Sequence, residues 1–197
     1  MSENYDIKRE RKDLYAPKQG DFQFVDVPEL GYLMVDGHGD PNTAASYRDA
    51  VEALYTLSYG VRAIAKKQLG RVHTVGPLEG LWSEEDPAAF TARDKGALDW
   101  TMMISQPDWI TAEIVDAARK APGPVRFERL TEGRSVQVMH VGSYDDEAPT
   151  LARLHDEFMP ANSLTFNGPH HEIYLSDPRK TEPARLKTIL RQPVTRA

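Results

Sequence analysis

The stretch GPHHEIYL at Gly168–Leu175 shares its opening glycine and proline, and the strand-like pattern that follows them, with GPLEGLW at Gly76–Trp82. Each stretch comes after a predicted helix. Each also precedes a further extended run, WTMMIS at residues 100–105 and KTILRQ at residues 187–192. Self-similarity of this kind is typical of an internally repeated fold. The chain therefore predicts two tandem copies of a strand–helix–strand–strand unit.

The segments before these stretches support the repeat. MVDGHGDP (residues 34–41) and MHVGSYDDE (residues 139–147) each end a predicted strand, place a glycine, and then place an aspartate three residues later, where a helix starts. In the first copy, apolar residues recur at helical spacing from Thr43 to Leu69, and Gly70 ends the pattern. The fold class predicted from these patterns is α+β, with an antiparallel sheet.

The boundaries of the two copies follow from the same pass along the chain. Residues 1–20 are polar and are expected to form a mobile N-terminal arm, and residues 21–197 a single domain. Half one covers residues 21–107, a linking helix covers residues 108–124, and half two covers residues 125–197. Around Glu132-Gly133, the runs VRFERL and SVQVMHVGS predict a β-hairpin.

Composition excludes several classes of function. The 197 residues carry a net charge of −6 with no basic face, which disfavours nucleic acid as a partner. The chain has no cysteine, which excludes thiolate catalysis and cysteine-based zinc sites. Without a signal-like start or an apolar run of membrane-spanning length, the expected location is the cytoplasm, with no membrane partner.

The strand at His170–Leu175 carries the strongest chemical signal. Because side chains alternate along a strand, His170, Glu172 and Tyr174 share one face, whereas His171 shares the other with apolar residues and should meet the helices. A carboxylate beside a phenol can position water and accept a proton. An apolar wall would raise the pKa of Glu172 and make it a stronger base. The alternative is a solvated sheet face.

The histidines do not predict a metal site. His170 and His171 point to opposite faces of their strand and cannot both ligate one ion without distortion. The other histidines show no ligand spacing, and no cofactor motif is present. We therefore expect neither a metal nor a cofactor.

Aromatic and sulfur side chains suggest an adaptable apolar pocket. The candidates are Trp82, Trp100, Trp109 and Met102, and the alternative for each is ordinary core packing. Glu79 is assigned, in the first copy, the place that Glu172 takes in the second, so the two acids could meet between the copies. The alternative for Glu79 is a surface pair with an arginine.

Taken together, several stretches resemble the GyrI-like (gyrase-inhibitor-like) family of small-molecule-binding proteins. The matching stretches are PLEGLW (77–82), DWTMMISQPDWIT (99–111), VQVMHVGSYDDEAPTL (136–151) and HHEIYLSDPRKTEPARLKTILRQPV (170–194). The resemblance covers nearly the whole chain after Asp21 and is most specific in its C-terminal half.

The resemblance implies a fold and a ligand site. It implies two strand–helix–strand–strand units with pseudo-twofold symmetry and a ligand cleft between the halves, with LKTILRQPV as the last strand. Glu172 resembles the buried glutamate that meets cationic aromatic drugs in related regulators, whose DNA-binding domain has no counterpart here. The chain also resembles stand-alone hydrolases of cyclopropane-bearing alkylating antibiotics. By this resemblance, Glu172 would activate a water molecule, and Tyr174 or Tyr144 would donate a hydrogen bond to the substrate carbonyl conjugated to the ring. The tryptophans and His170 would contact a flat ligand.

Three functions remain open on this basis. The protein could be a detoxifying hydrolase that opens an activated cyclopropane ring, and so confers antibiotic resistance. It could instead be a non-catalytic binder or sensor of flat aromatic or cationic molecules, which would use the same residues. A third possibility is an inhibitor of a protein partner such as gyrase, acting through the acidic segment EGLWSEEDPAAFTARD (79–94). The expected state is a monomer or a homodimer.

Overall fold

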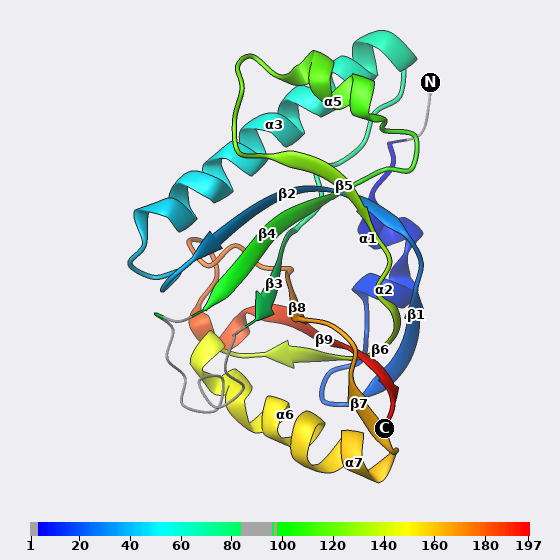
Figure 1. The fold of residues 1–197 in the computed structure, drawn as a ribbon, viewed down its shortest axis with the longest axis vertical. Coiled ribbons are helices and arrows are strands. Elements are labelled where there is room, and N and C mark those ends of the chain that lie inside the picture. The colour runs from blue at the N-terminus through cyan, green and yellow to red at the C-terminus, as the bar shows by residue number, and fades with distance from the viewer. Residues whose placement is uncertain (1–3, 84–95, 97) are drawn as a thin grey trace. The chain divides into compact units, whose positions relative to one another are not determined.

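The computed structural model describes residues 4–83, 96 and 98–197 (Figure 1). The described chain forms two compact units. The first contains Leu30–Leu130 with the N-terminal residues up to Glu10, and the second contains Arg11–Glu29 with Thr131–Ala197. The acidic segment proposed above for a protein partner falls for the most part outside the described residues.

The first unit is an antiparallel sheet in the order β3-β4-β2-β5, with helices α3 and α5 over one face (Figure 1). Its elements, in chain order, are α1 (Ile7–Glu10), β2 (Leu30–His38), α3 (Ala45–Leu69), β3 (Leu78–Ser83), β4 (Asp99–Gln106), α5 (Ala112–Ala118) and β5 (Arg126–Leu130).

Helix α3 confirms the helix predicted from periodicity, starting two residues later than expected. Its buried stripe of Leu54, Leu57, Val61 and Ala65 covers the sheet, because apolar residues at this spacing fall on one face of a helix. The helix ends where Gly70 adopts a left-handed conformation with φ 64°, which glycine tolerates without steric cost.

The second unit has the same plan. Its sheet has the order β1-β6-β9-β8, also antiparallel, with β7 on β9. The elements, in chain order, are α2 (Lys12–Tyr15), β1 (Gln23–Val27), β6 (Gly133–Val141), η2 (Tyr144–Glu147), α6 (Ala148–Ala152), η3 (Arg153–Phe158), α7 (Met159–Ala161), β7 (Leu164–Phe166), β8 (His170–Tyr174), η4 (Pro183–Arg185) and β9 (Lys187–Arg196).

The tandem repeat and the α+β class are confirmed. Strand, helix, strand and strand follow one another as β2-α3-β3-β4 in the first unit. In the second they follow as β6, the helical segment from Tyr144 to Ala161, β8 and β9. The two sheets also place corresponding strands at corresponding positions. LKTILRQPV is a strand, as the family resemblance implied.

The predicted hairpin is wrong. β5 pairs with β2 in the first unit, and β6 pairs with β1 and β9 in the second, so the two runs around Glu132-Gly133 lie in different units. The expected boundaries of the halves shift accordingly: β1 precedes the first repeat but completes the sheet of the second. Each sheet thus contains the strand that precedes the other repeat in the chain: β5 belongs to the first sheet and β1 to the second. No local sequence pattern indicates this exchange.

The described N-terminal residues, from 4 on, pack against the rest of the chain instead of forming the mobile arm expected from their polar composition. Leu14 is fully buried, and Ile7 and Tyr15 are nearly so. The carbonyl of Asp13 accepts a hydrogen bond from Nε2 of Gln137 at 2.8 Å, and that of Leu14 accepts one from Nη2 of Arg191 at 2.8 Å. In the second unit, the two apolar side chains of Leu14 and Tyr15 among many charges are enough to dock the part of this segment from residue 11 on, because the sheet offers buried donors for its carbonyls.

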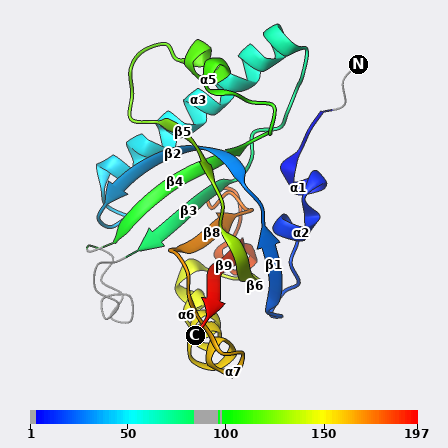
Figure 2. The same cartoon turned by 45° about the vertical axis from the view of Figure 1, so that its right-hand side comes forward.

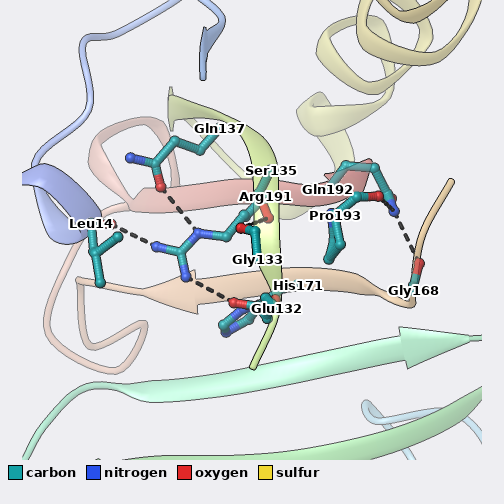
Figure 3. A network of polar contacts seen from close by, with 10 residues as sticks. All are labelled: Leu14, Glu132, Gly133, Ser135, Gln137, Gly168, His171, Arg191, Gln192 and Pro193. Atoms are coloured by element: carbon teal, nitrogen blue, oxygen red, sulfur yellow. Dashed lines mark hydrogen bonds and ion pairs between the residues drawn. The ribbon is translucent and has the colours of Figure 1, made fainter. Parts of the chain in front are cut away.

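A buried ionic cluster lies beneath this segment in the second unit (Figure 3). Arg191 has no exposed surface and contacts Glu132 at 3.2 Å and Gln137 at 3.1 Å. Glu132 also contacts Nδ1 of His171 at 2.9 Å. Burial alone would raise the pKa of Glu132, but His171 and Arg191 outweigh it and lower this pKa to about 2.

Within the second unit, helix α2 of the N-terminal segment lies next to strand β1, as Figures 1 and 2 both show.

No helix in the described part of the chain combines the length and the apolar character that crossing a membrane requires.

Replacing Glu132 tests the cluster. A carboxyl whose pKa is lowered in the folded state stabilises the protein above its unfolded pKa, and this stability is lost as the pH falls toward about 2. We expect Glu132→Gln to lower the free energy of unfolding by about 3 kcal/mol at neutral pH, because it leaves buried cations unpaired. The variant should also lose less stability than the wild type between about pH 5 and pH 2.

Urea unfolding across this pH range measures both effects. Glu157→Gln, at an exposed position of the same unit, is the matched control and should follow the wild type. Equal acid sensitivity of Glu132→Gln and the wild type would show that the cluster does not hold this carboxyl ionised.

Candidate functional site

Strand β8 brings Glu172, His170 and Tyr174 into contact on one face, as the alternation of the sequence predicted. The phenol of Tyr174 donates a hydrogen bond to Oε2 of Glu172 at 2.7 Å. Nε2 of His170 lies 3.3 Å from Oε1 of the same carboxylate. The His170 side chain is 4% exposed and that of Glu172 is 16% exposed, so the carboxylate is enclosed but still reachable.

The pKa of Glu172 differs from the expectation that an apolar wall would raise it. Burial does favour the neutral acid, but the hydrogen bond and charge of His170, followed by the phenol of Tyr174, outweigh burial and hold the pKa of Glu172 below its usual value. Polar partners on both oxygens are the reason. Glu172 is therefore a partly buried anion rather than a strong base.

Tyr144 joins this group from the short helical turn η2. Its ring meets that of Tyr174 edge-on, with centroids 5.8 Å apart. Burial, and then the negative charges of Glu147, Glu172 and Asp177, raise the pKa of Tyr144 to about 12. Because 40% of Tyr144 is exposed, its neutral phenol is a hydrogen-bond donor available at the open side of the group.

His155 is a neighbour that the sequence reasoning missed. Its ring lies edge-on to that of His170, with centroids 6.5 Å apart, and 5.1 Å from the ring of Phe166. It belongs to η3, a π-helical turn, which is a rare conformation found often at functional sites. A helical pattern of 3.6 residues per turn does not predict that His155 faces the sheet, because the π-helical turn changes the spacing of the side chains on that face.

The other face of β8 differs from the prediction. His171 and Ile173 were expected to meet the helices, but the helical segment contacts the face of Tyr174 and His170. His171 instead joins the buried cluster of Glu132 and Arg191. The cause is the N-terminal segment, which covers this face and leaves the helices to the face of Glu172.

In the first unit, Trp82 and Trp100 come together with a residue not singled out as a site residue, Tyr47 of α3. The ring centroid of Tyr47 lies 6.4 Å from that of Trp82 and 5.2 Å from that of Trp100. The ring of Trp100 lies so close to Gly37 that any added Cβ would overlap it. Met102 is fully buried on this same face. This cluster packs between α3 and the sheet, and a ligand role for its members stays a prediction.

Glu79 does not take the place of Glu172. It is fully buried, and alternation along β3 puts it on the face opposite Trp82, which contacts α3. On β8 the helical side carries Glu172 and Tyr174, so their counterparts on β3 are Gly80 and Trp82. Aligning the two stretches by their shared Gly-Pro would have shown this. A role for Glu79 in ligand binding stays a prediction.

Trp109 belongs to a different group. The guanidinium of Arg71 stacks over its ring at 4.7 Å, and the rings of His73 and Tyr5 lie beside it. None of these contacts involves the cluster around Trp82. Within the part of the chain that the structure describes, no three histidine or acidic side chains are grouped to hold a metal ion.

The model of the GyrI-like small molecule binding domain matches residues 20–194. A search of the curated proteins finds no match for the chain.

Among solved structures, an uncharacterized conserved protein from Listeria innocua is 39% identical, with a TM-score of 0.89, over 98% of this chain and 100% of that one. A hydrolase from the same organism is 37% identical, with a TM-score of 0.87 and the same coverage. The C-terminal domain of EcmrR shares the fold at 15% identity, with a TM-score of 0.61, over 90% of this chain and 98% of that domain.

The pKa of Glu172 can be measured directly. Carbon NMR of protein labelled at the glutamate carboxyls, assigned with Glu172→Gln, should show Glu172 titrating below the exposed glutamates. In Tyr174→Phe the midpoint should rise, because the carboxylate loses the 2.7 Å hydrogen bond that favours its charged form. A midpoint above those of the exposed glutamates in the wild type would contradict the arrangement described here.

Proposed function

Because the chain belongs to the family of GyrI-like small molecule binding domains, we propose that it binds a flat, lipophilic organic molecule against the Glu172 face of β8 and hydrolyses an activated cyclopropane ring in it. The observation that carries this proposal is the pair of polar neighbours on the Glu172 carboxylate, the hydrogen-bonding phenol of Tyr174 on Oε2 and the imidazole of His170 at 3.3 Å from Oε1, inside a largely buried group. A carboxylate held in one orientation can direct a water molecule toward a bound electrophile.

The proposed reaction requires little of the protein. The oxygen of a water oriented by Glu172 bonds to the ring carbon that is open to attack. A ring C–C bond breaks, and its electron pair moves through the conjugated system to the carbonyl oxygen. The proton that the water loses passes by way of Glu172 to that oxygen, so the product is the substrate plus one water. No electrons enter or leave the system.

The two tyrosines take different parts in this proposal. Tyr174 already donates to Glu172 and orients it. Tyr144 has a neutral phenol with a pKa of about 12 and an exposed side, and it is the donor we assign to the substrate carbonyl, where negative charge develops. Glu172 is a weak base because its pKa is lowered, so ring strain in the substrate supplies most of the driving force.

Two stand-alone relatives from Listeria innocua, 37% and 36% identical, are called hydrolases. Removing a reactive electrophile in this way would make the protein a detoxifying enzyme and a source of antibiotic resistance.

Non-catalytic binding is the second candidate function. The lowered pKa of Glu172 is the observation that favours it, because an anion that is already stabilised is better suited to hold a ligand than to remove a proton. A sequestering protein or sensor would need the same residues. Turnover separates the two functions.

Incubation with a cyclopropane-bearing alkylating antibiotic tests the proposal. We expect the wild type to release many equivalents of the water adduct, followed by chromatography. Glu172→Gln should lower kcat by at least about a hundredfold, because the amide cannot take the proton of the water. Tyr144→Phe should lower kcat about tenfold or more through the lost hydrogen bond to the carbonyl.

Glu182→Gln, at an exposed position of the second unit, is the control and should keep full activity. Binding of one equivalent without product would support the sequestering function instead. Equal turnover by the wild type and Glu172→Gln would remove Glu172 from the mechanism.

A further inference from the structure

Thr188 of strand β9 lies beside the candidate site and has no role in the function proposed so far. It pairs with Tyr174 of β8 on one side and with His140 of β6 on the other. Residues that pair directly in an antiparallel sheet point to the same face, so the Thr188 side chain lies on the face that carries Tyr174 and Glu172. Thr188 has no exposed surface.

The hydroxyl of Thr188 is buried with no hydrogen-bond partner among the residues that the structure describes. Nearly all buried hydroxyls have such a partner, because leaving one without it destabilises the fold. The polar atoms on either side are directed elsewhere: Nε2 of His140 contacts the carbonyl of Ser143 at 3.0 Å, and the phenol of Tyr174 donates to Glu172 at 2.7 Å. An apolar side chain would therefore suit packing better at this position.

The corresponding position of the first unit is filled in a different way. Trp82, the counterpart of Tyr174, pairs with Trp100 as Tyr174 pairs with Thr188. The indole of Trp100 meets the ring of Tyr47 edge-on, with centroids 5.2 Å apart, and its N–H donates to a backbone carbonyl at 3.2 Å. A large side chain with its polar atom paired thus occupies the place at which the second unit has a small side chain with an unpaired hydroxyl.

Glu172 is the diagonal neighbour of Thr188 on this face of the sheet. Diagonal neighbours lie about 7–8 Å apart, and the hydrogen bond from Tyr174 draws the Glu172 carboxylate toward the row that contains Thr188. One water molecule, with a partner at about 2.8 Å on either side, spans such a gap between two side chains. An ionised carboxylate only accepts hydrogen bonds, whereas a threonine hydroxyl also donates one, so the same water can bond to both.

We propose that Thr188 is the second residue that positions the attacking water, which it shares with Glu172. This inference rests on the hydrolysis proposed above. The water accepts the hydrogen of the Thr188 hydroxyl and donates one of its own to Glu172, so that its other lone pair is left for the ring carbon. The proton of the water leaves by way of Glu172 as before, and Thr188 neither gains nor loses a proton. A water held in two directions spends more of its time in the reactive orientation than one held by a carboxylate alone.

The shared water can be observed without any substrate. A crystal structure of the wild type that resolves ordered water should place one within about 3.2 Å of both Oγ1 of Thr188 and the carboxylate of Glu172. Thr188→Val keeps the shape of the side chain and removes the hydroxyl, so this water should be missing from its structure. The urea midpoint of Thr188→Val should be no lower than that of the wild type, because the variant removes a buried polar group.

Turnover tests whether this water is the one that attacks. With the cyclopropane-bearing antibiotic, Thr188→Val should lower kcat about tenfold or more and change KM less than about twofold, because the water loses its orientation and the substrate keeps its contacts. Thr188→Ser keeps the hydroxyl and should stay within about threefold of the wild-type kcat. When methanol is added, its adduct should form a larger share of the product in Thr188→Val, since water is no longer held in preference.

Thr195→Val is the matched control, because Thr195 is exposed on the same strand. It should leave kcat, the urea midpoint and the shared water unchanged. Absence of the shared water from the wild type, or an equal kcat in Thr188→Val and the wild type, would overturn the inference. So would a Thr188→Ser variant as impaired as Thr188→Val, since the side chain would then act through packing. If Thr188→Val does not fold, Thr188→Ala takes its place in every comparison.

Failure of the underlying function would look different. If the wild type holds the shared water but releases no adduct, the proposed hydrolysis is wrong, and the role of Thr188 in it is wrong with it. If the wild type turns over and Thr188→Val does so equally well, the hydrolysis stands and only the role of Thr188 is refuted.

Discussion

A guanidinium with no exposed surface, that of Arg191, lies near the middle of the last strand. Several parts of the second unit supply the hydrogen-bond acceptors and the negative charge that this buried cation requires. Arg191 has five N–H groups and a charge that cannot be removed by deprotonation, so its surroundings must provide acceptors and a negative charge. Glu132 provides the charge, and the side chain of Gln137 and the carbonyl of Leu14 provide acceptors. These come from the link after β5, from β6 and from the N-terminal segment, so a single side chain connects three distant parts of the chain.

This constraint explains why the polar N-terminal segment is ordered. From residue 11, where it joins the second unit, its own side chains bury little apolar surface, apart from Leu14 and Tyr15. Two of its carbonyls accept hydrogen bonds from side chains of the sheet, and in a buried setting such bonds are costly to lose. With the segment in place, one face of the sheet is covered, and the helical segment from Tyr144 to Ala161 packs on the other.

The arrangement also sets the chemistry of Glu172. Because His171 is held by Glu132 on the covered face, β8 has a defined orientation, and its next residue points to the helical side. There the two oxygens of Glu172 meet one imidazole and one phenol, which keep the carboxylate ionised against the effect of burial. The same strand thus contributes one histidine to the buried ionic cluster and another to the candidate site.

The sequence by itself determined the elements and the repeat, because periodicity, turn glycines and strand alternation are local properties. The span of α3, the shared face of His170, Glu172 and Tyr174, and the α+β class all followed from such signals. The resemblance in the C-terminal half identified the family. Tertiary structure alone decided which strands pair, since β1 and β5 each join the sheet of the other repeat. It also decided the direction of the pKa shift of Glu172, because that depends on which groups lie within hydrogen-bonding distance, and distances across a fold cannot be read from spacing along a chain.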